Sequence, residues 1–156
     1  MWFAHIHWLI ASLLFGLAGW AHFDLMMGWG PAARFGAFLP WPAFIGLAWG
    51  TWVMLIVLTL VAARLTTWEA TFRGLRLPLG VVRRGLDYHA AHYLPVALLA
   101  AATVIGYRLW LGHNPVRLIQ WGSAYLYALC VEVIICAVYL FKTYWIGMRN
   151  MMYASR

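Results

Sequence analysis

Histidines near the ends of apolar segments are the residues of this sequence best suited to hold a cofactor. His5 and His7 open the first apolar segment, and His89 and His92 open the third. A b-type heme requires two neutral imidazoles on facing helices, so His7 and His92 are candidate axial ligands. Histidine also suits a membrane interface, because its ring joins an apolar body to a polar edge. We favour this second interpretation, with no cofactor and no metal, and keep heme b as the alternative.

Glu132 is the one acidic residue that lies well inside an apolar segment. A carboxylate in the hydrocarbon core is costly unless it is protonated, paired or hydrated. Glu132 therefore marks either a functional position or a hydrogen bond to a Thr, Tyr or His on a neighbouring helix, which would fix packing or assembly. The sequence places no second carboxylate at this depth, so it predicts no proton or ion path through this chain alone.

The motifs of a catalytic centre are missing from the sequence. It contains no CxxCH heme-attachment motif, no phosphate-binding loop and no nucleophile–base pair. Cys130 and Cys136 fall on different faces of one helical run, which argues against a disulfide or a redox pair. These features favour a protein without enzymatic activity.

The elements that must position these residues are four membrane-spanning helices. Hydrophobic residues make up 65% of the 156 residues and charged residues 10%, whereas soluble domains carry about 25% charged residues. A spanning helix needs about 20 apolar residues. Four runs meet this length, at about 2–23, 42–63, 88–111 and 118–141. The sequence therefore predicts an all-α membrane protein that forms a single domain over residues 1–156.

Basic residues indicate how the chain crosses the membrane. Arginines are concentrated between the second and third spans, and further basic residues follow the fourth. The connections on the other side carry only Arg34, Arg108 and Arg117. By the positive-inside rule, both termini and the 64–87 connection are cytoplasmic. The net charge of +7 then reflects topology and lipid contact, and direct nucleic-acid binding is not expected.

The 64–87 connection has the pattern of a helix that lies in the membrane interface. Its apolar residues recur at helical spacing, at Trp68, Phe72, Leu75 and Leu79. Because Gly74, Pro78 and Gly80 interrupt this pattern, we expect one short amphipathic piece rather than a long helix.

Two further features concern helix packing. Gly46 and Gly50 form a small-xxx-small pair on the second span, which permits close approach of helix backbones. The connection at 112–115 is a tight turn that makes the third and fourth spans an antiparallel hairpin. Four spans with short connections leave little room for an internal pocket, so we expect a subunit of a larger assembly.

The C-terminal half carries a series of short motifs in a characteristic order. They are Arg83 and Arg84, then Tyr88-His89-Ala90-Ala91-His92, then His113-Asn114-Pro115, and finally Phe141-Lys142-Thr143-Tyr144. In this order the chain resembles a family of inner-membrane proteins encoded by integrating conjugative elements and conjugative plasmids. It departs from that family at His92, where the family has Lys, and it lacks the large outer domain of such proteins in its first half.

The resemblance implies a non-enzymatic partner of the coupling ATPase of type IV secretion, located in the bacterial inner membrane. In that setting four arginines would face lipid phosphates or an acidic partner surface: Arg73, Arg76, Arg83 and Arg84. Our first functional hypothesis is therefore a structural subunit of a conjugation or secretion complex. The alternative is a b-type cytochrome subunit that uses His7 and His92 to pass electrons between a quinone and a redox partner.

Overall fold

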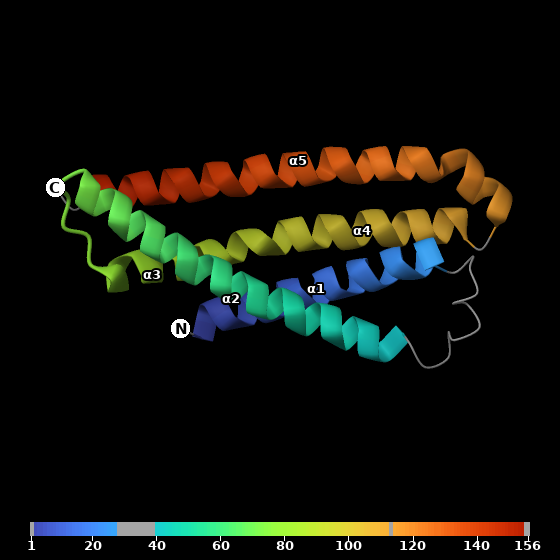
Figure 1. Ribbon diagram of the computed structural model, residues 1–156, viewed down its shortest axis with the longest axis horizontal. Helices are drawn as coiled ribbons and strands as arrows, with labels where there is room; N and C mark the ends of the chain where they lie inside the picture. Colours follow the sequence, from blue (N-terminus) through green and yellow to red (C-terminus); the bar gives the residue numbers. More distant parts are fainter. Residues whose placement is uncertain (1, 28–39, 113, 155–156) are drawn as a thin grey trace.

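The computed structural model describes residues 2–27, 40–112 and 114–154, and the regular structure of these residues is helical. The helices are α1 (Trp2–Met27), α2 (Pro40–Phe72), α3 (Leu79–His89), the short 3-10 helix η2 (Ala90–His92), α4 (Tyr93–Leu111) and α5 (Pro115–Ala154) (Figure 1). Four stretches are long and apolar enough to cross a membrane: α1, α2, the run from α3 to α4, and α5. The predicted all-α fold with four spans is confirmed.

The two ends of the bundle differ in charge. Figure 1 shows that α1 begins and α5 ends at the same end, where α2 also ends and α3 lies. We call this the terminal end, and the end where α4 leads into α5 the loop end. Toward the terminal end lie Arg64, Arg73, Arg76, Arg83, Arg84, Lys142 and Arg149. Of the described basic residues, the loop end has Arg108 and Arg117.

Helix α1 lies at the centre of the packing, in contact with both α2 and α4. Small side chains allow this close contact. One buried cluster contains Ala4, Trp8 and Ala11 of α1, Leu55 of α2, and Ala90 and Ala97 of η2 and α4. Because lipid tails are as apolar as the helices, close van der Waals contact of this kind drives helix association in a membrane.

Gly16 of α1 marks a close approach to α2. A Cβ atom on Gly16 would lie 2.8 Å from the Cβ of Ala48, closer than real Cβ atoms come. The predicted packing pair, Gly46 and Gly50, does not serve this interface, because a Cβ at either position would meet nothing within 4 Å. At about 100° per residue, both glycines face away from the side of α2 that carries Ala48. A packing role for them remains a prediction for contact with another chain.

The predicted short amphipathic helix exists, but it is α3 rather than the segment around 68–79. Trp68 and Phe72 continue α2, and the turn that follows contains Gly74 at a φ of +74°. Glycine takes this conformation at no steric cost, because it has no Cβ. Helix α3 then buries Val82 and Leu86 and exposes its arginines. The apolar periodicity of the sequence continues across Gly74. The prediction from this periodicity therefore placed the amphipathic helix too early in the chain.

Helices α4 and α5 form the predicted antiparallel hairpin. After α4 the chain turns at Gly112, whose φ is +56°. Asn114 caps α5, because its Oδ1 accepts the backbone N–H of Val116 at 3.0 Å. Pro115 occupies the first helical position, where a missing N–H has no cost. The histidine of the predicted turn, His113, lies outside the described residues.

Helix α5 is much longer than a membrane crossing needs. Its 40 residues extend over about 60 Å, whereas the hydrocarbon core of a bilayer is about 30 Å thick. The predicted fourth span, 118–141, covers roughly the first two thirds of this helix, which continues to Ala154. Among its residues only Tyr125 and Met148 are buried. Most of its surface is therefore left for lipid or for another protein.

Candidate functional site

One face of α5 carries polar side chains along the membrane-spanning region. Tyr125, Glu132, Cys136 and Tyr139 recur at the spacing of a single helix face. Tyr125 is fully buried, whereas Val133 on another face is 66% exposed. This polar face of α5 is therefore turned toward the other helices.

Three tyrosine hydroxyls of α5 form hydrogen bonds to other helices. They pair Tyr125 with Nδ1 of His22 (2.5 Å), Tyr139 with Nδ1 of His92 (2.8 Å) and Tyr144 with Oγ1 of Thr66 (2.6 Å). The partners belong to α1, η2 and α2. Side-chain hydrogen bonds between membrane helices contribute about 0.6 kcal/mol on average and up to about 1.7 kcal/mol. These three contacts link α5 to three other helices, in addition to its packing against α3 and α4.

An ion pair joins α1 to α4 at the loop end. Nε and one terminal nitrogen of Arg108 both donate to Oδ2 of Asp24, at 2.8 Å and 2.7 Å. The Arg108 guanidinium also lies over the ring of Trp20, 5.3 Å from its centre. In the sequence analysis Arg108 served only to orient the chain, and this pairing was missed. The sequence does indicate this pair. Asp24 and Arg108 carry opposite charges, and each lies near the end of a span that crosses the membrane in the same direction as the other.

Glu132 stands apart from these contacts. It forms no hydrogen bond and no ion pair with any residue in the described ranges, so the predicted bond to a Thr, Tyr or His on a neighbouring helix is not formed. The side chain is half-buried on the polar face of α5. An uncompensated carboxyl group is thus left in the middle of a membrane-spanning helix.

The candidate heme ligands each have a separate partner. His7 donates its Nδ1–H to the carbonyl oxygen of Phe3 at 2.7 Å, and the two rings lie 4.0 Å apart. His92 uses Nδ1 for its hydrogen bond to Tyr139, and its ring lies 5.1 Å from that of His89. Heme ligands are commonly oriented through Nδ1 in this way, which leaves Nε2 for the iron.

Two observations bear on whether a heme or a metal fits. Ala4, Ala90 and Ala97 close the contact of α1 with η2 and α4, and each is at most 1% exposed. A porphyrin between His7 and His92 would have to separate these small side chains, so the residues as packed do not fit a heme. Within the described ranges, no group of three or more His, Cys, Asp or Glu side chains is placed to hold a metal ion.

The four predicted contact arginines are all exposed at the terminal end. Arg73 lines a cleft between α2 and α5, and Arg76 lines a more open hollow in the turn after α2. Arg76, Arg83 and Arg84 project from the connection after α2 and from α3. Arg73 forms an ion pair with Glu69 at 2.6 Å, and both line the cleft between the ends of α2 and α5. Sequence reasoning missed this cleft, because its two walls are far apart in the chain.

Helix α5 thus packs against α3 and α4, and its tyrosine hydrogen bonds reach α1, α2 and η2. No protein-family model, no curated protein and no solved structure matches this chain, and its function therefore has to be inferred from its own residues.

Proposed function

We propose that this chain is a non-enzymatic membrane subunit of a multi-protein complex, and that another subunit binds against α5. The observation that carries this proposal is the lack of a partner for Glu132 within the described part of the chain. A carboxyl group at this depth costs several kcal/mol unless something pairs with it or protonates it. A donor on the helix of another subunit would remove this cost.

The shape of the bundle supports a helix as the binding partner. Figure 1 shows α2 and α5 close together at the terminal end and diverging toward the loop end. Between the two helices lies an apolar hollow of about 380 Å³. Its lining comes mainly from α1 (Phe15, Ala18, Gly19 and His22), with Thr51 and Met54 of α2, Val104 of α4 and Leu129 of α5. Leu129 lies one helical turn from Glu132 on the same face of α5. A partner helix in this hollow would therefore reach the carboxyl group.

The resemblance of the C-terminal half favours a conjugation complex. On this proposal the partner is the coupling ATPase of type IV secretion or a membrane subunit beside it. The charge asymmetry of the bundle supports an orientation with the terminal end in the cytoplasm of a bacterium, by the positive-inside rule. The exposed arginines Arg76, Arg83 and Arg84 would then face the cytoplasmic side of the inner membrane, where acidic partner surfaces and anionic lipids are found.

Purification of the full chain in native-like lipid particles tests this proposal. We expect the coupling ATPase or another membrane subunit to co-purify with the wild type. Glu132→Leu should abolish this, and Glu132→Gln should retain part of it, because an amide still accepts a hydrogen bond. Val133→Ala, on an exposed face of α5, is the matched control and should change nothing. Recovery of the wild type as a lone monomer, or full partner binding by Glu132→Leu, would refute the proposal.

A b-type cytochrome subunit is the second candidate function. The observation in its favour is that His7 and His92 are both hydrogen-bonded through Nδ1. Against it stands the close contact of Ala4 with Ala90 and Ala97, which leaves no space for a porphyrin between the two histidines as the helices are packed. A visible spectrum after expression with sufficient heme decides between the two functions. A Soret band that is lost in His7→Ala and in His92→Ala, but kept in His5→Ala, would establish the cytochrome.

A further inference from the structure

The cleft at the terminal end combines charged and apolar side chains. It has a volume of about 250 Å³ and lies between the end of α2 and the last turns of α5. Its apolar side includes Leu75 and Met148, and Met148 is only 4% exposed. On a neighbouring face of α5, Met151 contacts Gly85 of α3. The two methionines seat the end of α5, so one wall of the cleft is fixed.

The charged groups of the cleft sum to one positive charge. Arg73 and Arg149 line it from opposite walls, and Glu69 is its one acidic group. Glu69 accepts a hydrogen bond from one terminal nitrogen of Arg73 at 2.6 Å, which leaves further N–H donors of that guanidinium unused. Arg149 lies over the ring of Tyr153 at 5.5 Å and forms no ion pair with a described acidic residue. The cleft therefore has capacity for one anionic group.

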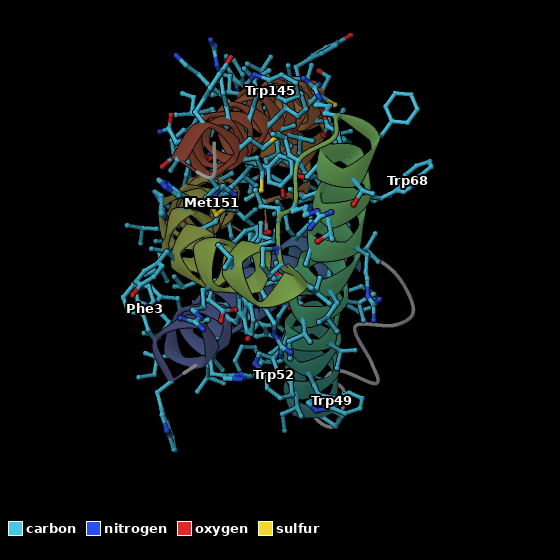
Figure 2. All side chains as sticks on the ribbon, turned by 90° about the vertical axis from the view of Figure 1, so that its left-hand side faces the viewer. Phe3, Trp49, Trp52, Trp68, Trp145 and Met151 are labelled. Atoms are coloured by element: carbon cyan, nitrogen blue, oxygen red, sulfur yellow. The ribbon has the colours of Figure 1, made fainter. Side chains whose placement is uncertain are left out.

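Exposed aromatic side chains around the cleft indicate that it lies at the level of the lipid headgroups. Phe72, next to Arg73, is 89% exposed, and Trp68 one turn earlier is 72% exposed. Figure 2 shows Trp68 projecting away from the bundle. Trp145, which lines the cleft on α5, is 46% exposed. Aromatic rings exposed in this way collect at the boundary between hydrocarbon and headgroups.

We propose that this cleft binds the phosphodiester of an anionic glycerophospholipid, with phosphatidylglycerol as the representative headgroup. The guanidinium groups of Arg73 and Arg149 donate to the phosphate oxygens, a geometry to which arginine is well suited. Met148 and Trp145 give the glycerol and the upper acyl chains an apolar surface. The single positive charge of the cleft matches the single negative charge of this lipid and favours it over a zwitterionic one. The inference does not depend on which complex the chain joins.

Native mass spectrometry of the full chain tests the inference. The protein is released from mixed micelles that contain equal amounts of phosphatidylglycerol and phosphatidylcholine, and the ratio of the two bound lipids is measured. The wild type should retain phosphatidylglycerol selectively. Arg149→Gln should lower this selectivity about tenfold, because it removes a charge-assisted contact. Glu69→Gln should raise it, because the cleft gains positive charge.

Arg84→Gln is the matched control, because Arg84 is an exposed arginine of the same end that lies outside the cleft lining. It should leave the selectivity unchanged. An equal loss in Arg84→Gln and Arg149→Gln would mean diffuse attraction to a basic surface and would overturn the inference. A second arm replaces the lipid by inorganic phosphate. Retention of phosphate alone by the chain, at the concentration at which phosphatidylglycerol is retained, would also overturn the lipid assignment.

Discussion

Replacement of Gly16 by alanine tests the packing at the centre of the bundle. The new Cβ would lie 2.8 Å from the Cβ of Ala48 and 3.0 Å from its backbone Cα and N. Carbon atoms in contact lie about 3.5–4.0 Å apart. Because two of these three neighbours are backbone atoms, α1 and α2 would have to move apart rather than rotate a side chain. Overpacking of this kind costs about 1–3 kcal/mol.

Gly50→Ala is the matched control for this substitution, because a Cβ at Gly50 meets nothing within 4 Å. Both variants gain the helix propensity of alanine over glycine, about 1 kcal/mol in water. The difference between the two variants therefore isolates the strain at Gly16, which we expect to be about 1–3 kcal/mol. Reversible unfolding in mixed detergent micelles, followed by tryptophan fluorescence, measures it. Equal stability of the two variants would refute the close approach of α1 to α2.

Two more predictions concern the polar contacts between helices. A double-mutant cycle of Tyr125→Phe with His22→Ala should give a coupling energy of about 0.6–1.7 kcal/mol in the same unfolding assay, because the Tyr125 hydroxyl and Nδ1 of His22 lie 2.5 Å apart. A coupling near zero would show that this hydrogen bond does not hold α5. Arg108→Leu should cost about 1 kcal/mol, because it leaves the Asp24 carboxylate unpaired at the loop end. The double variant with Asp24→Asn should recover most of this loss, and a double variant no more stable than Arg108→Leu alone would contradict the ion pair.

The number of spans could be predicted from sequence because lipid imposes a simple rule of length and polarity. The ends of the helices could not, because backbone hydrogen bonding continues past the membrane surface wherever the residues permit a helix. Helix α2 runs on to Phe72 and α5 to Ala154, both beyond the apolar runs that predicted them. The true stop after α2 is the turn at Gly74, which apolar spacing alone does not reveal.

Contacts between helices were harder to predict, because a helix that is apolar on all sides gives no sign of which face turns inward. Gly46 and Gly50 matched a packing motif, yet Gly16 makes the close contact with α2. His92 was recognised as a candidate from its residue type, but its partner Tyr139 depends on the rotation of α5. The Asp24–Arg108 pair is different, because charge and depth alone would have found it.

Helices α1 and α5 are held in the bundle by different kinds of contact. Helix α1 is fixed by close contact of small side chains, which Ala4 and Ala97 illustrate. The three tyrosine hydrogen bonds of α5 together contribute only about 2 kcal/mol at the average value for membrane helices. Near its end α5 also packs through Met148 and Met151 against α2 and α3, but most of its surface faces outward. A partner at Glu132 and a lipid between Arg73 and Arg149 would act at different points along it, so each would add stability that the other cannot replace.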